Sequence, residues 1–203
     1  MIAVLDYGIG NLRSAQKALE KVGAEARLTA DPDEVAAADG VVLPGVGAFG
    51  RCMEALREAG LEGPAREAID RSVPFLGICI GMQLLYEGSE EDPSTPGMGV
   101  LAAGVHRLPD GVKRPQMQWN RLDAVEADSP VLAGLDDGAW VYFVHSFAPD
   151  PTPEVVATCD YGGPVVAAVQ RGTLWATQFH PEKSGAAGLR LMANFVAAAG
   201  GPG

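Results

Sequence analysis

The sequence has too few cysteines, too widely spaced, for a disulfide framework or a structural zinc site. Its three cysteines, Cys52, Cys79 and Cys159, are an odd number with no Cys-x-x-Cys spacing and no neighbouring pair of histidines. We therefore expect no bound metal, and we interpret Cys52 and Cys159 as packing residues. Cys79 has a different setting, because it stands between two glycines.

Long apolar runs and an excess of positive charge are also missing. No stretch approaches the roughly 20 apolar residues that cross a bilayer, and residues 1–6 (MIAVLD) lack the basic start of a signal peptide. The formal net charge of -11, with both signs interspersed, would repel the phosphate backbone of a nucleic acid. We therefore expect a cytoplasmic protein that binds neither membrane nor nucleic acid.

No linker or low-complexity tract divides the 203 residues, of which 47% are hydrophobic. A chain of this length and composition can bury one substantial core. We expect a single domain spanning residues 1–203, with a frayed tail at residues 200–203.

The most informative stretch is residues 77–83 (GICIGMQ). The apolar run before it, residues 73–76, is typical of a buried strand, and residues 82–86 are typical of a helix. Cys79 would then lie in a strand-to-helix turn and be flanked by glycines as in a nucleophile elbow. The start of a helix beside it would favour thiolate over thiol. A buried cysteine in a glycine-rich packing turn would show the same pattern, and the elbow alone does not separate the two.

Expected strands and helices alternate over roughly the first 90 residues. Residues 2–5 and 41–43 are expected strands, and a helix with one apolar face is expected after residue 11. This alternation predicts an α/β fold with a mainly parallel central sheet covered by helices on both faces.

The second half of the chain contains short apolar segments separated by turn-forming residues. We expect these segments to be strands, and to extend the central sheet in antiparallel fashion. They are residues 101–105, 140–144, 155–158, 165–169 and 173–179. A last helix is expected after them, capped by Ser184.

A candidate base for the cysteine lies near the end of the chain. Pro181 biases His180 toward an extended conformation, in which residues two apart point to the same side, and His180 and Glu182 can therefore lie together. An imidazole that takes the thiol proton and a carboxylate that fixes its tautomer would complete a triad. Of the other histidines, His106 fits a structural role better, and His145 fits a structural or a functional role equally well.

Residues 44–50 (PGVGAFG) follow an expected strand. The segment has the composition of an ordinary connection to the next helix. Its glycines would also allow backbone N–H groups to turn toward a ligand, as an oxyanion site requires. The sequence leaves both interpretations open.

Taken together, residues 77–83 and 178–182 (QFHPE) resemble the class I, or triad, glutamine amidotransferases. Further segments are similar to one branch of this family, in which the glutaminase is a separate subunit: residues 6–12, 44–49, 116–120, 142–146 and 180–184. The resemblance extends from residue 1 to about residue 198. One departure is Gln118, because a glycine is expected before Trp119.

The resemblance implies a flavodoxin-like α/β fold and hydrolysis of L-glutamine through a cysteine thioester, without cofactor or metal. Cys79 would attack the side-chain amide carbon of glutamine. His180 would protonate the departing ammonia and then activate the water that releases glutamate, and Glu182 would orient His180.

The resemblance also implies the contacts around this triad. Backbone N–H groups of Val46 or Gly47 and of Ile80 would bind the oxyanion. Glutamine would be held by Gly45, Gln83, Glu91, His145 and Ser146. Ammonia would pass to a separate (β/α)8-barrel cyclase subunit, which would lie against Asn11, Trp119, Asn120 and Lys183.

Three rival functions remain. A glutaminase subunit of another synthase, such as pyridoxal phosphate synthase, would have the same elbow, but residues 6–12, 116–120 and 142–146 argue against it. A non-catalytic interaction protein of the same fold would be expected to lack the cysteine or the histidine, and both are present. A cysteine peptidase or esterase would be distinguished by an assay of free glutamine against peptides.

Overall fold

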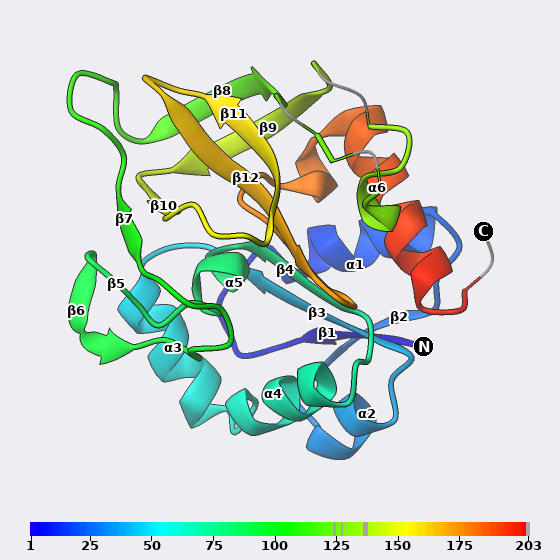
Figure 1. The fold of residues 1–203 in the computed structure, drawn as a ribbon. Coiled ribbons are helices and arrows are strands. Elements are labelled where there is room, and N and C mark those ends of the chain that lie inside the picture. Colours follow the sequence, from blue (N-terminus) through cyan, green and yellow to red (C-terminus); the bar gives the residue numbers. More distant parts are fainter. Residues whose placement is uncertain (124, 127, 136–137, 202–203) are drawn as a thin grey trace.

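Figure 1 shows the protein as a computed structural model, which describes residues 1–123, 125–126, 128–135 and 138–201. The described helices are α1 (Leu12–Lys21), α2 (Pro32–Ala36), α3 (Phe49–Glu58), α4 (Glu62–Asp70), α5 (Ile80–Gln83), α6 (Gly185–Ala198) and the 3₁₀ helices η1 (Pro130–Leu132) and η2 (Pro181–Lys183). The described strands are β1 (Ile2–Leu5), β2 (Ala26–Thr29), β3 (Gly40–Gly45), β4 (Phe75–Cys79), β5 (Gly88–Ser89), β6 (Asp92–Pro96), β7 (Val105–Arg107), β8 (Gln116–Arg121), β9 (Trp140–His145), β10 (Phe147–Pro149), β11 (Val155–Asp160), β12 (Pro164–Arg171) and β13 (Leu174–Thr177).

A central sheet organises the fold. Within the described part of the chain it has seven strands, in the order β11-β12-β13-β4-β3-β1-β2. The five strands from β13 to β2 pair in parallel and have the strand order of flavodoxin-like folds. β12 and β11 continue the sheet through antiparallel pairs. The predicted fold class, a mainly parallel sheet with an antiparallel extension, is confirmed.

Helices cover both faces of this sheet (Figure 1). α1 and α6 lie together on one side of the parallel strands, and α2, α3 and α4 lie on the other. Leu19 of α1, Leu56 of α3 and Phe195 of α6 are fully buried against the strands. Each such side chain contributes about 1.5–3 kcal/mol by leaving water. Because both faces are covered, β1, β3, β4 and β13 are buried along their whole length.

The carboxyl ends of three neighbouring strands meet at one edge of the sheet. Gly45 at the end of β3 is the partner of Cys79 at the end of β4, and Thr177 at the end of β13 pairs with Ile78. Three segments far apart in the sequence, which begin at residues 46, 80 and 178, therefore leave the sheet side by side. Ligands of open α/β sheets bind at such an edge.

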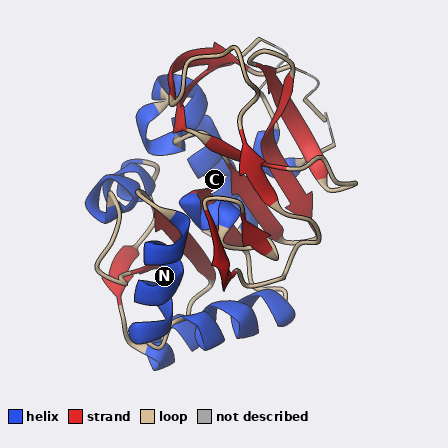
Figure 2. Cartoon of the chain, turned by 90° about the vertical axis from the view of Figure 1, so that its left-hand side faces the viewer, coloured by secondary structure: helices blue, strands red, loops and turns tan. Residues whose placement is uncertain are grey.

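The second half of the chain departs from the sequence-based expectation in two places. Residues 101–104 are not a strand, and β7 begins at Val105 and joins a small sheet with β5, β6 and β10. Residues 140–144 do form a strand, but β9 pairs with β8 instead of extending the central sheet. β9 buries only alternate side chains, because only one face of this ribbon packs on the core. Figure 2 shows this strand-rich end at the upper right, with most helices below and to the left.

Ser184 occupies the predicted N-cap position of α6, but its side chain does not cap the helix. The Ser184 hydroxyl makes no cap hydrogen bond to α6. It donates to the carbonyl of His180 at 2.6 Å and accepts from the backbone N–H of Tyr142 at 3.0 Å. Ser184 therefore ties the loop that carries His180 to β9, which is a more specific task than capping.

The predicted frayed tail lies partly outside the described residues, which end at Gly201. Gly200 and Gly201 still donate backbone hydrogen bonds to the end of α6, at Ala197 and Val196. No helix in the described part of the chain has the length and apolar character needed to cross a bilayer.

Candidate active site

Cys79 occupies the predicted elbow at the end of β4. Its φ of 54° lies in the left-handed region, which residues other than glycine rarely adopt. This backbone conformation turns the thiol away from the strand. The two glycines of the motif are required by close backbone contacts. A Cβ on Gly81 would lie 1.8 Å from the carbonyl oxygen of Leu43, and one on Gly77 would lie 2.9 Å from that of Gly81. The glycines around Cys79 therefore serve both purposes that the sequence suggested: they allow close packing, and they form the elbow that exposes the thiol.

The helix that follows is shorter than the sequence suggests. α5 ends at Gln83 after four residues, and residues 84–86 are not helical. A single turn has only a small dipole, because the macrodipole is the sum of many aligned peptides. The expectation that a helix start favours the thiolate therefore has little support, and another positive group is needed.

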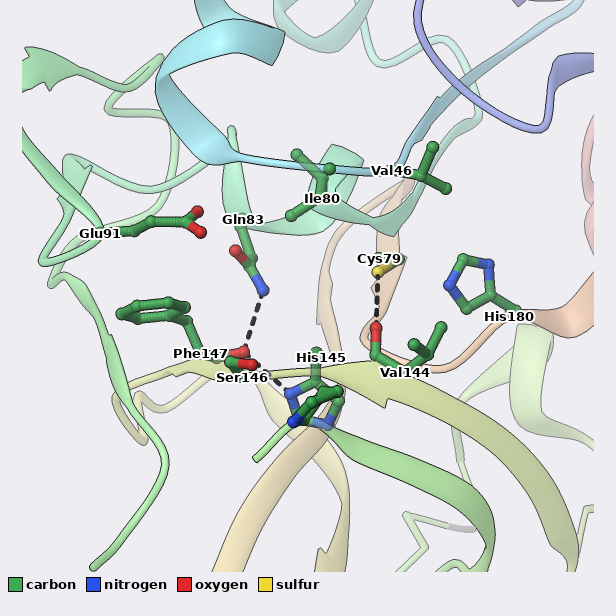
Figure 3. A pocket seen from close by; sticks show the side chains of 12 residues that line it. Val46, Cys79, Ile80, Gln83, Glu91, Val144, His145, Ser146, Phe147 and His180 are labelled. Carbon is green, nitrogen blue, oxygen red and sulfur yellow. Dashed lines mark hydrogen bonds between the residues drawn. The ribbon is translucent and has the colours of Figure 1, made fainter. Parts of the chain in front are cut away.

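His180 supplies that group. It follows β13, is extended as Pro181 predicts, and is buried. Its Nδ1 lies 2.8 Å from Oε1 of Glu182, whose side chain is also buried. Its other ring nitrogen points toward the sulfur of Cys79 (Figure 3). The three predicted triad residues are thus brought together, with Glu182 behind His180 and Cys79 in front.

The pKa of His180 reflects its two partners. Burial lowers this pKa, but hydrogen bonding and charge interactions with Cys79 and then Glu182 outweigh burial and raise it to about 9. At neutral pH the ring is therefore protonated when the sulfur is a thiolate. A thiol facing a basic imidazole is the arrangement by which a cysteine can be activated as a nucleophile.

The other two histidines differ from His180. Burial lowers the pKa of His145 to about 4, and its Nδ1 lies 2.8 Å from the carbonyl oxygen of Phe147. His145 is therefore neutral and donates to that carbonyl. His106 is exposed, beside Glu90 and Asp150, and does not line the pocket, in agreement with the structural role expected for it.

A pocket of about 250 Å³ opens in front of the cysteine. Most of the predicted substrate and oxyanion residues line it, together with three residues that the sequence did not single out. The lining residues are Val46, Gly47, Cys79, Ile80, Gln83, Glu91, Pro115, Val144, His145, Ser146, Phe147 and His180. Gly45 lies behind them, where a Cβ would come within 2.8 Å of the Tyr7 hydroxyl and 2.9 Å of Ile80. Gly45 thus permits close packing beneath the pocket.

Two of the predicted substrate residues already have partners inside the protein. Oε2 of Glu91 accepts from the backbone N–H of Phe49, at the start of α3. Nε2 of Gln83 donates to the carbonyl of Phe147 and to Oε1 of Gln178, both at 3.0 Å. Gln83 can therefore offer a ligand only its Oε1, which is buried and has no partner among the described residues.

The predicted partner residues lie away from the pocket, on and beside the β8–β9 ribbon. Trp119 packs edge-on against Tyr142 with ring centroids 6.1 Å apart, and Lys183 Nζ lies 5.9 Å from the centre of the Tyr142 ring. Asn120 donates to the carbonyl of Asp160, and Asn11 accepts from the hydroxyl of Ser14. The structure thus joins Trp119 and Lys183 in one cluster, but leaves Asn11 and Asn120 in separate local contacts.

Met117 and Trp140 extend this cluster, although the sequence did not single them out. Both side chains are exposed, and the β8–β9 register puts them on the same face of the ribbon as Trp119 and Tyr142. We call Met117, Trp119, Trp140, Tyr142 and Lys183 the ribbon surface. Exposed aromatic side chains gathered in this way are typical of a protein–protein interface.

The described residues contain no group of three or more histidine, cysteine or acidic side chains placed to hold a metal ion. The side chains that meet at the pocket are a thiol, an imidazole and a carboxylate, which are the groups that covalent catalysis by a cysteine requires.

Comparison with known proteins places this geometry in context. The profile of the family described as glutamine amidotransferase class-I matches residues 3–199. The chain is 51% identical to the imidazole glycerol phosphate synthase subunit HisH of Synechococcus sp. (strain JA-3-3Ab), over 96% of this chain and 92% of that protein. It is 49% identical to the HisH subunit of Rhodopirellula baltica, over 98% of each chain.

The fold has solved counterparts as well. A crystal structure described as a glutamine amidotransferase superposes with a TM-score of 0.77 at 25% identity, over 98% of both chains. The structure of PurLQS from Thermotoga maritima contains a chain that superposes with a TM-score of 0.75 at 21% identity, over 97% of both chains. At that identity the second likeness concerns the fold alone.

Proposed function

This chain belongs to the class I glutamine amidotransferase family, and we propose that Cys79, His180 and Glu182 are the triad with which it hydrolyses L-glutamine. It is the glutaminase subunit of an imidazole glycerol phosphate synthase, because several relatives about 50% identical over nearly their whole length are named as the HisH subunit of that synthase. The observation that carries the assignment of the triad is the buried pair His180–Glu182, which lies behind the elbow sulfur.

In the first half of the reaction, the sulfur of Cys79 attacks the side-chain amide carbon of glutamine. The C–N bond then breaks, the electron pair goes to nitrogen, and the His180 imidazolium gives its proton to the departing ammonia. The raised pKa of His180 supports this role, because the ring carries that proton before ammonia leaves. The product is a glutamyl thioester on Cys79.

In the second half, neutral His180 takes a proton from water as the water oxygen attacks the thioester carbon. The C–S bond breaks, the electron pair returns to sulfur, and glutamate leaves. Glu182 holds the imidazole in one orientation through both steps, because its carboxylate accepts from Nδ1. The oxyanion of each tetrahedral state is bound, in this proposal, by the backbone N–H of Ile80 and that of Val46 or Gly47.

Glutamine occupies the 250 Å³ pocket in this proposal. Glu91, the unpartnered Oε1 of Gln83 and the residues 145–146 face its amino-acid end, because they line the pocket away from the triad. These groups include acceptors suited to an ammonium group. No metal or other cofactor is used.

The partner in this proposal is a (β/α)8-barrel cyclase subunit. It receives the ammonia and converts a phosphoribulosyl formimino intermediate to imidazole glycerol phosphate and aminoimidazole carboxamide ribotide in histidine biosynthesis. The ribbon surface, extended by Asn11 and Asn120, is the face proposed to dock on it, and the whole of residues 1–203 acts as one domain.

The test of the triad separates glutamine hydrolysis from the use of ammonia. The complex with His180→Ala should lose activity with glutamine but form product when ammonium salt is supplied, because the acceptor site lies in the other subunit. His106→Ala is the matched control and should keep glutamine-dependent activity. A complex that ammonium cannot rescue would show that His180 supports assembly, and an active His180→Ala complex would refute the triad.

The test of the partner uses the ribbon surface. Trp119→Ala and Lys183→Ala should weaken co-purification with the cyclase subunit, or the stimulation of glutamate release by the cyclase ligand. The melting temperature of the chain alone should hardly change, because both side chains are exposed. Arg51→Ala, on the exposed side of α3, is the control. Unchanged assembly and stimulation in both variants would place the partner on another face.

A further inference from the structure

A chain of buried amides runs from the pocket to the sulfur of Cys79. The carbonyl of Phe147 accepts from Nε2 of Gln83, and the same Nε2 donates to Oε1 of Gln178. Nε2 of Gln178 in turn lies 3.6 Å from Sγ of Cys79 and donates to it. Both glutamines are buried, and Gln178 follows directly after β13. Gln178 has no part in the triad, yet it contacts the atom that reacts.

The donor and acceptor of each hydrogen bond in this series are determined by the carbonyl of Phe147, where the series begins. A backbone carbonyl can only accept, so the group that Gln83 turns toward Phe147 must be its NH₂. His145 Nδ1 donates to the same carbonyl, which confirms that this oxygen serves as an acceptor here. Because Nε2 of Gln83 also meets Gln178, the atom of Gln178 that faces it must be Oε1. The NH₂ group of Gln178 is thereby directed at the sulfur.

We propose that Gln178 is a catalytic residue of the glutaminase, whose side-chain N–H stabilises the Cys79 thiolate, and that Gln83 is a positioning residue that holds Gln178 in this orientation. The inference deepens the function proposed above and rests on it. Two steps benefit from the contact. The thiolate forms before it attacks glutamine, and it forms again when the C–S bond of the thioester breaks and the electron pair returns to sulfur. A buried donor that points at a developing charge is effective, because it needs no reorientation during the reaction.

The ionisable groups near the sulfur of Cys79 do not take the place of such a donor. His180 faces Sγ from the loop after β13, with Glu182 behind it. Tyr7, in the turn after β1, and Cys52, on α3, also lie near the sulfur. Burial raises the pKa of both groups, that of Cys52 to about 11, and keeps them neutral. Among the described residues that line the pocket, the acidic one is Glu91, and it is exposed. His180 therefore supplies the positive charge, and Gln178 supplies a neutral hydrogen bond from a second direction.

The chain contains a matched control for a merely structural role. Gln116 is also buried, and its Nε2 donates to the sulfur of Cys159 at 3.9 Å. No histidine is among the groups that shift the pKa of Cys159, which burial raises to about 12. The same amide–sulfur contact thus occurs once at the elbow and once in the core, and only the first is expected to affect reactivity.

The experiment measures how fast iodoacetamide alkylates Cys79 in the full-length protein as a function of pH, with the modified peptide quantified by mass spectrometry. Gln178→Met removes the donor and keeps the length of the side chain. We expect the midpoint of the pH profile to rise by about one unit, which slows alkylation about tenfold below the midpoint. The turnover number for glutamine should fall by about tenfold or more, with a smaller change in KM. Gln83→Met should act in the same direction by a smaller factor.

Gln178→Glu is the second variant, because it keeps the acceptor for Gln83 and nearly the same shape but has no N–H group. It should show at least the loss seen in Gln178→Met, whereas Gln116→Met should shift only the melting temperature. A folded Gln178→Glu protein with the wild-type pH profile would overturn the proposal. If the wild-type complex with the cyclase subunit failed to hydrolyse glutamine, the proposed function would fall, but the alkylation profile would still decide the role of Gln178.

Discussion

Cys79 and Cys159 occupy similar surroundings and are expected to behave in opposite ways. Both are buried, and both sulfurs accept from a buried glutamine amide. Cys159 lies within strand β11, and burial raises its pKa to about 12, against the weaker opposing effect of Gln116. Cys79 lies in a left-handed turn that directs its sulfur toward His180. In the proposal made here, the strained turn and the facing base make the buried Cys79 thiol a nucleophile, and an amide contact alone is expected to leave the Cys159 thiol unreactive.

The comparison is tested most directly by removing each sulfur. Cys79→Ala should lower glutamate release by a factor on the order of 10⁴ or more, because the thioester can no longer form. Cys159→Ala should leave the turnover number within about twofold of wild type. The measurement is glutamate formed by the complex at saturating glutamine. Substantial activity without the Cys79 sulfur, in a folded protein, would remove the nucleophile from this proposal.

The next largest effect is expected from Glu182→Gln. The amide is nearly the same size but carries no charge, and it can turn its NH₂ group toward Nδ1 of His180, which would hold the ring in the wrong tautomer. We expect a fall in turnover on the order of 10²-fold or more, with a lower pKa of His180. NMR titration of the labelled histidine checks the second point. An unchanged histidine titration would show that Glu182 does not govern the ring.

The elbow and the base could be predicted because each depends on residues that are close in the sequence. Gly77 and Gly81 are needed where the backbone passes against itself, and their spacing around Cys79 therefore reports local geometry. His180 and Glu182 are two residues apart, with Pro181 between them. Pro181 keeps His180 extended as predicted, but Glu182 lies in the 3₁₀ helix η2 and not in a continuing extended segment, so the pair was predicted correctly and its local conformation was not. The alternating pattern of the first half also determines the parallel sheet, because β-α-β units of this length allow few topologies.

The parts that could not be predicted depend on which distant segments meet. Residues 140–144 have a clear strand pattern, but such a pattern does not name the pairing partner, and β9 pairs with β8. Gln178 carried a usable signal, since a glutamine in an apolar strand must satisfy its amide. That its partners are Gln83 and Cys79, 95 and 99 residues away, follows only from the fold.

The pH dependence of stability provides a third test. Burial lowers the pKa of His180, but Cys79 and Glu182 raise it from an ordinary 6.5 to about 9. A pKa raised by folding stabilises the protein fully below 6.5, and this contribution is lost as pH rises through about 9. We expect the free energy of unfolding of the wild type to fall by on the order of 2–3 kcal/mol across this window.

Cys79→Ala removes the first of the two groups that raise the pKa of His180, and it should therefore flatten this pH dependence. Cys159→Ala should retain the wild-type slope, because its sulfur has no histidine beside it. Urea unfolding of the three proteins at several pH values measures the slopes. Equal slopes in wild type and Cys79→Ala would mean that the sulfur does not hold the proton on His180.

The smallest expected effect concerns Cys159, the cysteine that is expected to be unreactive. In Cys159→Ala, a small cavity replaces the sulfur, and the Nε2 of Gln116 loses its acceptor in a site where its Oε1 already has no partner among the described residues. The cavity and the unsatisfied donor together should lower the free energy of unfolding by about 1–2 kcal/mol.

Cys159→Ala combined with Gln116→Leu also removes the unpaired amide of Gln116. The double variant should recover part of the lost stability, since two apolar side chains leave no buried donor to satisfy. Thermal unfolding of Cys159→Ala, Gln116→Leu and the double variant measures the difference. A double variant less stable than the sum of the two single changes would show that the Gln116 amide has another partner, and that the resemblance between the two cysteine sites is only geometric.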